Sequence, residues 1–334
     1  MVEKTRALRG NRRTGRRKKK KSKWRWLGYA LTALLILVVA YAIYLSTLAA
    51  NVTNKAHKQL ERGEKSEKRV EAVYPGKDNF SVLFIGVDER KGEKQSRSDV
   101  LILATFNKDD KTIKMVHIPR DSRVYIPGYY ETKINHAHFW GGVDLAVETV
   151  EELFDVPVDY YVKLNFEAFM DIVDAIGGIT VDVEKTFSEM DSKDRKNRIT
   201  IHAGRQTLNG EEALAYVRMR KQDPLGDIGR GQRQQQVIKA IIEKSASISS
   251  ITKYDDILNS LGDNLTTNFT FQNLVALHKY AGSLRSIETL KLEGKDLYLD
   301  NIYYYDLDEE SVAEISRELK EHLGIADEDQ LVQH

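Results

Sequence analysis

The sequence predicts an α/β protein in which helices pack against a central sheet, preceded by one membrane-spanning helix. Three observations lead to this prediction. Short apolar segments bounded by turn residues recur between residues 80 and 118, which is typical of strands. Beyond them, segments with helical spacing alternate with further strands up to residue 183. Residues 27–49 contain no charged side chain over a length that can span a bilayer.

The composition indicates a folded protein rather than a disordered one. The chain has 334 residues, of which 41% are hydrophobic, so it can bury a large core. It contains no cysteine. This excludes disulfides, a thiolate nucleophile and a cysteine zinc site.

The first 25 residues are strongly basic. They contain thirteen Lys or Arg and one acid, and because the whole chain carries +1, residues 26–334 carry −11. A basic run alone could bind nucleic acid, but the apolar segment that follows favours a topology signal. We therefore predict a cytoplasmic tail over residues 1–26, an uncleaved signal-anchor helix over 27–49 and an extracellular remainder. A cleaved signal peptide is the alternative, but its apolar core would be shorter, about 7–15 residues.

The region after the anchor divides by composition. Residues 50–78 are polar and charged, which predicts a helical or extended extracellular stalk. The folded domain is expected over residues 79–325, and residues 326–334 are expected to form a flexible C-terminus.

The first three strands are expected over residues 80–87, 100–106 and 112–118, and they are predicted to form an antiparallel meander. In a meander, the end of the first strand, the start of the second and the end of the third lie on one rim. The residues expected to converge there are Asp88, Asp99, Arg120 and Asp121.

This rim has two possible interpretations. Carboxylate oxygens are suitable ligands for Mg²⁺, and guanidinium groups bind phosphate oxygens with two parallel contacts. The bordering arginines are Arg90, Arg97, Arg120 and Arg123. Acids and arginines together indicate a Mg²⁺-assisted phosphoryl site, but solvated ion pairs on loops would give the same pattern. These residues alone do not decide between them.

The middle of the chain predicts more sheet and helix. His136 and His138 could bind a metal, but without a third ligand we interpret them as hydrogen-bonded loop histidines. A helix is expected over residues 142–154, a strand over 158–164 and a helix over 165–176 that begins at Asn165. The apolar residues of the second helix cover more than one face. This predicts sheet-packing core for most of them, with the wall of an apolar pocket as the alternative.

The segments from residue 178 onward alternate again. They are a strand over 178–183, a mobile polar surface loop over 188–197 and a short helix over 209–216. The C-terminal part is expected to contribute helices over 254–261 and 271–280, strands over 287–292 and 302–305, and a last helix whose apolar face includes Ile315 and Leu319.

Arginines are concentrated between residues 218 and 233. If the chain is extended there, Arg218 and Arg220 point to one side. A helix is expected to begin near Gly229 and Gly231, and its period places Arg230, Arg233 and Gln234 on the inward face. An inward arginine at a helix N-terminus is unfavourable unless an anion binds there. This favours a phosphate site over a structural ion-pair network.

Six motifs resemble the LytR-CpsA-Psr family over about residues 79–245. They are Phe84-Ile-Gly-Val-Asp-Glu-Arg90, Arg97-Ser-Asp99, Ile118-Pro-Arg-Asp121, Lys133-Ile-Asn-His-Ala137, Asn209-Gly-Glu-Glu-Ala-Leu-Ala-Tyr-Val-Arg-Met-Arg220 and Arg230-x-x-Arg-Gln-Gln-Gln236. The resemblance implies an α-β-α sandwich with a central mixed sheet and an apolar pocket for a polyprenyl lipid. It also implies a Gram-positive enzyme that moves a phosphate-linked glycopolymer, such as wall teichoic acid or capsule, from undecaprenyl pyrophosphate to peptidoglycan.

The resemblance also assigns roles to individual residues. Mg²⁺ binding falls on Asp88 and Asp99. Pyrophosphate binding falls on Arg97, Arg120, Arg218, Arg220, Arg230 and Gln234. The residues proposed to take part in catalysis are Asp99, Arg120 and Asp121, with Asp99 or Asp121 as acceptor of the hydroxyl proton.

Two other functions remain open at this stage. A lipid-pyrophosphate hydrolase or binding protein would use the same residues with water in place of the acceptor sugar. A membrane-tethered transcription attenuator would use the basic tail, but the remaining −11 charge would repel DNA.

Overall fold

The structure is a computed structural model that describes residues 56–89, 95–220, 222–224, 226–245, 264–270, 272–273, 276–277 and 286–325. The expected cytoplasmic tail, the helix over 27–49, Arg90, the helix over 254–261 and the C-terminus over 326–334 lie outside these residues. Within the described part of the chain, every helix is too short or too polar to cross a bilayer.

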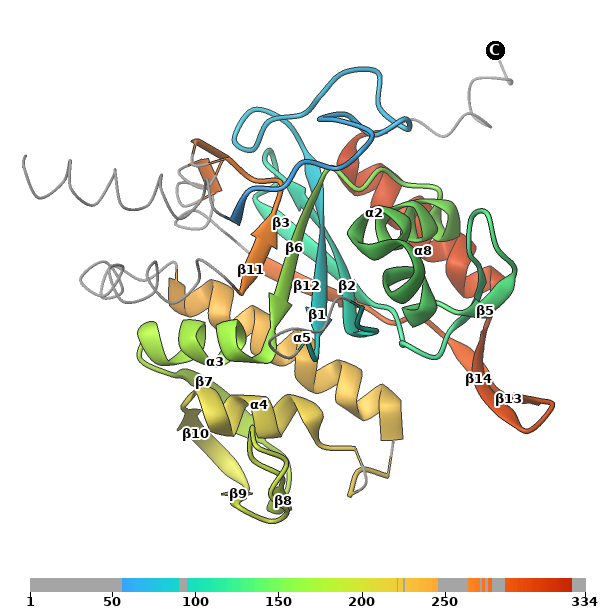
Figure 1. The fold of residues 1–334 in the computed structure, drawn as a ribbon. Coiled ribbons are helices and arrows are strands. Elements are labelled where there is room, and N and C mark those ends of the chain that lie inside the picture. Colours follow the sequence, from blue (N-terminus) through green and yellow to red (C-terminus); the bar gives the residue numbers. More distant parts are fainter. Residues whose placement is uncertain are drawn as a thin grey trace, which may run out of the picture. The chain divides into compact units, whose positions relative to one another are not determined.

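A mixed sheet of six strands lies at the centre, in the order β11-β6-β1-β2-β3-β12 (Figure 1). The strands are β1 (Phe80–Val87), β2 (Ser98–Asn107), β3 (Thr112–His117), β6 (Tyr160–Asn165), β11 (Leu265–Thr267) and β12 (Ser286–Leu290). β2 pairs antiparallel with β1 and β3, while β6 and β12 pair in parallel with β1 and β3. This confirms the predicted meander and the mixed sheet.

Both faces of the central strands are buried. Along β1, Leu83 and Ile85 belong to the core on one face, and Phe80 and Val82 to the core on the other. Side chains of a strand alternate between faces, so apolar residues at successive positions require cover on both sides. The sheet is therefore the middle layer between two layers of helices.

One layer consists of α2 (Asn135–Phe154) and α8 (Glu309–Leu323) (Figure 1). The side chain of Asp308 accepts the backbone N–H of Ser311 and caps the start of α8, and Gly324 ends it in the left-handed region. α8 buries Ile315 and Leu319, as predicted.

The two histidines expected in a loop lie in the first turns of α2. His138 Nδ1 lies 2.7 Å from the carbonyl oxygen of Ser96, and His136 Nδ1 lies 3.0 Å from Thr132 Oγ1. The predicted hydrogen bonds are confirmed, but the prediction that the two histidines lie in a loop is wrong. The helix runs on both sides of a break at Gly141 and Gly142, where Gly142 has a φ of +65°.

The second layer contains α5 (Gly226–Ser245), with α3 (Phe166–Ala175) and α4 (Gly210–Arg218) beside it. Asn165 caps α3 through the N–H of Ala168, and Asn209 forms a capping box with Glu212 in α4. These helices share a core with small strands. The strands are β7 (Ile179–Val183), β8 (Phe187–Glu189), β9 (Ile199–Ile201) and β10 (Gly204–Leu208).

The segment predicted as a mobile polar surface loop, residues 188–197, is mostly the loop that connects the two strands of a hairpin. β8 and β9 pair antiparallel, and the connection turns around the buried side chain of Asp191. Its carboxylate accepts the backbone N–H groups of Lys193 and Arg195. The carboxylate of Asp191 thus organises the turn, which composition alone does not show.

The described part of the expected stalk packs against the domain. Leu60 is buried in the core that α2 and α8 share. Arg69 forms an ion pair with Asp159, with Nη2 and Oδ2 2.7 Å apart, and Arg62 pairs with Glu151 of α2. Residues 56–78 are therefore part of the folded region.

Two further hairpins extend from the rim of the sheet. β4 (Arg123–Tyr125) pairs with β5 (Glu131–Lys133), and β13 (Gly294–Leu299) pairs with β14 (Ile302–Leu307). The sequence predicted β14 but not β13. Asp300 and Asn301 form the turn with positive φ angles, the conformation that suits a two-residue hairpin.

Candidate active site

The rim predicted from the meander is present, and a bulge shapes it. Gly86 pairs with Val100 and Val87 pairs with Ser98, so Asp99 is the extra residue of β2. Bulges re-aim side chains next to functional sites. Asp88 follows β1 directly, so the two predicted carboxylates lie at the same end of neighbouring strands.

Arg120 joins two carboxylates just after β3. Its Nη1 lies 2.6 Å from Asp99 Oδ1, and its Nε lies 3.5 Å from Asp121 Oδ2. The side chains of Arg120 and Asp99 are about a third exposed or less, so the pair faces a partly open site. The prediction that these three residues lie close together is confirmed.

Asp121 is held from two sides. Its Oδ1 lies 2.7 Å from Lys133 Nζ, and its backbone oxygen accepts the N–H of Tyr305 of β14 at 2.9 Å. Burial alone would raise the pKa of this carboxyl. The hydrogen bond and charge of Lys133, with the charges of Arg120 and Arg220, outweigh burial and hold the pKa below its usual range. Asp121 is thus an anion that orients the cations around it.

Arg97 lies on the α2 side of the rim. Its guanidinium is 5.9 Å from the ring centre of Phe139. The pKa of His136 is lowered first by burial and then by the charges of Arg97 and Lys133. In the described ranges, no three His, Asp or Glu side chains come together as a metal-binding group.

The inward face of α5 closes the site over β3. Arg230 and Gln234 are both buried, as the helical period predicted. They lie beside His117, the last residue of β3. Burial and, to a smaller extent, the charge of Arg230 lower the pKa of His117 to about 4, against an opposing effect of the hydrogen bond with Gln234. The imidazole is therefore neutral beneath the arginine.

Arg233 has a structural role instead. It forms an ion pair with Asp223, and its guanidinium donates to the backbone oxygens of Tyr216 and Met219. The helix begins at Gly226 rather than near Gly229 and Gly231, so Arg230 lies in its second turn and Arg233 turns toward α4. The ion-pair reading is correct for this arginine.

Arg218 differs from the expectation of an extended segment. It is the last residue of α4, with its guanidinium 5.3 Å from the ring centre of Phe166 and its Nη2 2.9 Å from Asp194 Oδ1. Arg220 follows the helix and is exposed, and its charge acts on Asp121. The two arginines therefore border the site from different directions.

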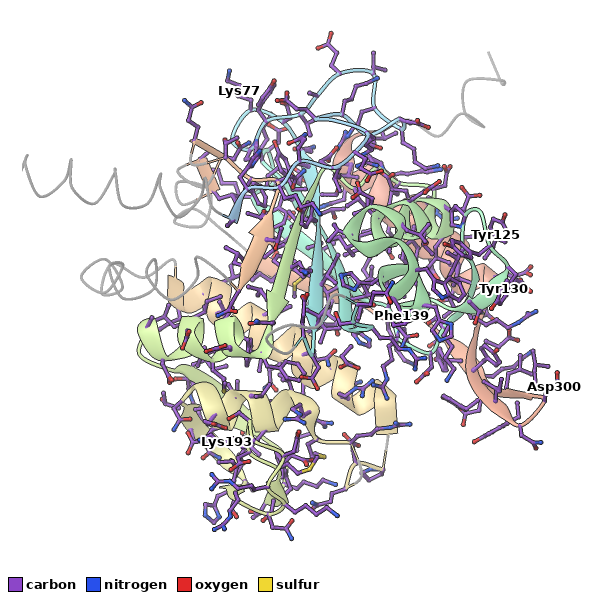
Figure 2. The ribbon with its side chains drawn as sticks, viewed as in Figure 1. Lys77, Tyr125, Tyr130, Phe139, Lys193 and Asp300 are labelled. Atoms are coloured by element: carbon purple, nitrogen blue, oxygen red, sulfur yellow. The ribbon has the colours of Figure 1, made fainter. Side chains whose placement is uncertain are left out.

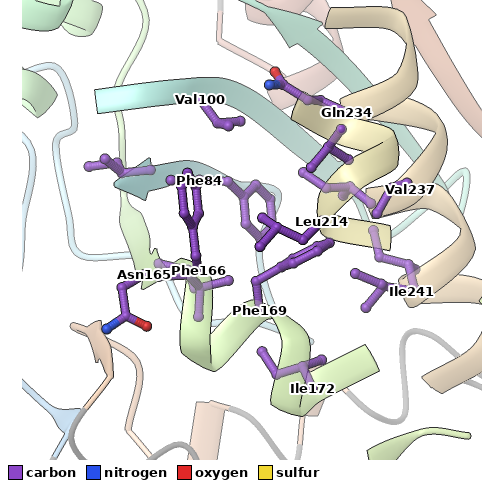
Figure 3. A pocket seen from close by; sticks show the side chains of 17 residues that line it. Phe84, Val100, Asn165, Phe166, Phe169, Ile172, Leu214, Gln234, Val237 and Ile241 are labelled. Atoms are coloured by element: carbon purple, nitrogen blue, oxygen red, sulfur yellow. The ribbon is translucent and has the colours of Figure 1, made fainter. Parts of the chain in front are cut away.

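An apolar cavity of about 150 Å³ lies directly below the rim (Figure 3). Side chains of β1, β2 and β6 line it on one side, and side chains of α3, α4 and α5 line the other. Phe166, Phe169 and Ile172 come from α3, which shows that this face of the helix borders a cavity. Gln234 is the lining residue that also contacts the buried group around His117.

Residues that line the cavity are sequence neighbours of residues in the charged rim. Val100 and Val217 line the cavity, and their neighbours Asp99 and Arg218 carry the charges above it. Sequence reasoning missed two groups of this arrangement, Lys133 and His117. Lys133 lies in a quoted motif, but only the tertiary structure shows that it reaches Asp121.

Comparison with known proteins identifies close relatives. The model of the LytR_cpsA_psr family matches residues 43–321. A relative from Bacillus subtilis (strain 168), the polyisoprenyl-teichoic acid–peptidoglycan teichoic acid transferase TagT, is 44% identical over 322 residues, covering 94% of this chain and 99% of the relative. A structure of TagT bound to LIIa-WTA superimposes with a TM-score of 0.71 at 44% identity, covering 80% of this chain and 100% of that one. A structure of the same protein with bound octaprenyl pyrophosphate lipid gives a TM-score of 0.67 at 41% identity, with coverage of 80% and 100%.

Proposed function

The chain belongs to the LytR-CpsA-Psr family, and we propose that it transfers a teichoic-acid-type glycopolymer from a polyprenyl pyrophosphate carrier to peptidoglycan. The observation that carries this proposal is the apolar cavity beneath a rim of arginines. A polyprenyl pyrophosphate has the same two parts, a hydrocarbon chain and a doubly charged head. The TagT relative whose structure holds octaprenyl pyrophosphate supports this match.

The cavity accommodates the first part of the hydrocarbon chain. Its lining is almost entirely apolar, which suits an isoprenoid chain. Arg97, Arg120, Arg218, Arg220, Arg230 and Gln234 then border the pyrophosphate. Guanidinium groups suit this role because their fork geometry matches phosphate oxygens.

Transfer requires a sugar hydroxyl to attack the phosphorus that carries the glycopolymer. The new P–O bond forms to the acceptor, and the bond to polyprenyl phosphate breaks. The arginines stabilise charge that develops on the pyrophosphate oxygens. Asp99 or Asp121 accepts the hydroxyl proton, and Asp121, which Lys133 holds in place, also positions Arg120.

Asp88 and Asp99 are the residues that fit Mg²⁺. Both supply hard carboxylate oxygens at the same end of adjacent strands, and the bulge removes Asp99 from the regular ladder. Arg120 contacts Oδ1 of Asp99, which leaves the second oxygen of that carboxylate for a cation. When bound, the metal would neutralise charge on the pyrophosphate oxygens.

We also place this domain outside the cell. Peptidoglycan lies there, and residues 27–49 provide an uncharged anchor behind a basic tail. A reporter fused to the C-terminus should be active outside the cell, and external protease should leave residues 1–25 uncut.

The decisive experiment uses the full-length protein with labelled teichoic acid on polyprenyl pyrophosphate. Label should enter purified peptidoglycan, and release of free polymer should be slow when peptidoglycan is omitted. Equal release with and without the acceptor would identify a hydrolase instead. Phe169→Asp, which places a charge in the cavity, should abolish lipid recovered by mass spectrometry after purification, whereas Val70→Asp, at a site 94% exposed, should retain it.

A further inference from the structure

The two hairpins beside Asp121 carry an unusual amount of exposed aromatic surface. Tyr130, next to β5, is 61% exposed, and Tyr298 of β13 is 69% exposed. Figure 2 shows Tyr130 at the outer edge of the β4–β5 side, and Asp300 marks the end of the β13–β14 hairpin nearby. Exposed aromatic residues gathered in one region indicate a binding surface.

This aromatic region adjoins the candidate active site. Ser122 bridges to Tyr305, whose N–H donates to the backbone of Asp121, so β14 is anchored on the catalytic candidate itself. The side chain of Lys133 also links Asp121 to the β13–β14 hairpin. Its Nζ lies 2.7 Å from Asp121 Oδ1 and 5.8 Å from the ring centre of Tyr303. A molecule on these rings would therefore reach the rim.

The rings hold one another in defined positions. Tyr129 stacks on Trp140 with ring centres 4.6 Å apart and planes inclined by 21°, and Tyr130 lies 5.5 Å from the same ring. On the other hairpin, Tyr298 meets Tyr303 edge-on at 5.5 Å. Aromatic pairs in these geometries stabilise one another. We call Tyr129, Tyr130, Trp140, Tyr298 and Tyr303 the tyrosine surface.

Polar groups of both signs surround the tyrosine surface. Glu131 pairs with Arg123, Lys133 lies over the ring of Tyr303, and Asp296 accepts the hydroxyl hydrogen of Tyr303. Such groups, together with tyrosine hydroxyls, can exchange hydrogen bonds with sugar hydroxyls. Flat rings pack against the C–H faces of pyranose sugars, since both are apolar surfaces of similar size. The surface therefore suits a sugar chain.

We propose that the tyrosine surface binds the glycan strand of the peptidoglycan acceptor and guides its hydroxyl to the rim. This inference rests on the proposed function, because it assigns the acceptor side of the same reaction. The phosphate-rich donor would then approach along the arginines, and the acceptor would approach along the two hairpins. Lys133 lies at the boundary between the two, in contact with both Asp121 and the rings.

The test compares two double variants, each of which replaces two exposed apolar side chains by serine in the full-length protein. The first is Tyr130→Ser with Tyr298→Ser, which removes the most exposed rings of the tyrosine surface. The control is Tyr74→Ser with Val70→Ser, whose side chains are 50% and 94% exposed near the opposite end of β1. β1 separates that end from the rim by about 26 Å at the rise of a strand.

The measurements are binding to peptidoglycan sacculi stripped of wall polymers, binding of the donor lipid, and transfer. The first variant should raise the apparent KM for sacculi about tenfold, with kcat changed by less than about twofold and donor binding unchanged. The control should match the wild type. Both should melt within a few degrees of the wild type, because the altered side chains are exposed.

Three results would overturn the inference. One is equal sacculus binding by all variants while the wild type transfers normally. Another is a loss of donor binding that accounts for the whole effect. The third is a loss of binding to anionic lipid vesicles with sacculus binding retained, which would assign the hairpins to the membrane. Failure of the proposed function is distinguishable, because the wild type would then bind sacculi through these rings without transferring polymer.

Discussion

Gly231 of α5 lies directly against the imidazole ring of His117 at the end of β3. A Cβ built on Gly231 would lie 2.4 Å from His117 Nδ1 and 2.6 Å from Cε1, closer than real Cβ contacts. The ring cannot retreat easily because His117 is buried on the sheet. Glycine at 231 thus lets α5 approach the sheet closely enough to place Arg230 and Gln234 over the rim.

This contact predicts that Gly231→Ala is destabilising. At an unhindered helix position the change would stabilise by up to about 1 kcal/mol, but here overpacking should cost about 1–3 kcal/mol of the free energy of unfolding. Denaturant unfolding measures it. The double variant with His117→Ala should recover most of the loss, since the clash needs both side chains. Additive effects of the two substitutions would show that the ring is not the obstacle.

The buried histidines predict a specific dependence of stability on pH. Burial lowers the pKa of His117 and of His322 to about 4. Above pH 6.5 both histidines are neutral in both states and contribute nothing. Between pH 6.5 and about 4 the unfolded chain binds these protons and the folded chain does not. The free energy of unfolding therefore decreases as the pH is lowered through this range.

The expected loss is about 3 kcal/mol for each histidine at the acidic end of this range. His322→Gln should remove one of the two contributions and flatten the curve, although it also alters the contacts of His322 with Thr105 and Thr112. Urea unfolding between pH 4.5 and 7.5 measures the slope. A slope in the variant equal to that of the wild type would contradict the assignment.

The sequence predicted those parts of the fold that local signals determine. Short apolar segments and the turn residues between them predicted the β1–β2–β3 meander, and Asn165 marked the start of α3. The rim residues Asp99, Arg120 and Asp121 followed from the meander, because strand order fixes which ends meet. In each case, the controlling interactions lie within a few residues or in neighbouring strands.

The remaining features depend on partners far away in the sequence. Arg218 was expected to be extended, but the buried face of α4 extends the helix through this residue. Residues 56–78 were predicted to be part of a stalk because they are polar and charged and lack a strong apolar period. Arg69 contacts Asp159, which lies ninety positions later in the sequence. No periodicity in the chain indicates such pairs, and Lys133 and His117 were missed for the same reason.

The metal assignment predicts that Asp88→Ala and Asp99→Ala each reduce transfer and its dependence on Mg²⁺. The physical reason is the loss of a hard oxygen ligand, while the exposed rim leaves folding nearly unchanged. Asp109→Ala, at the opposite end of the β2–β3 hairpin, serves as a control. Binding of Mg²⁺ measured by calorimetry provides a readout independent of activity. Unchanged Mg²⁺ affinity in both rim variants would remove the metal role.

The last prediction separates arginines that bind phosphate from those that hold the fold. Arg230 lies beside the cavity residue Gln234, whereas Arg233 forms an ion pair with Asp223 and donates to two carbonyl oxygens. Arg230→Lys keeps the charge and loses the planar fork, so transfer should fall about ten- to a hundredfold at a nearly unchanged melting temperature. Lysine at 218 or 220 should act in the same direction.

Arg233→Ala provides the structural counterpart in the same helix. It removes the ion pair from the mostly buried carboxylate of Asp223, which should cost up to about 3–5 kcal/mol of the free energy of unfolding. The folded fraction of this variant, assayed well below its melting temperature, should still transfer polymer. Parallel melting curves and transfer rates measure both effects. Loss of a side chain that binds substrate lowers the rate, whereas loss of one that neutralises a buried acid lowers stability. An unstable but fully active Arg230→Lys together with a stable but inactive Arg233→Ala would therefore reverse the two roles.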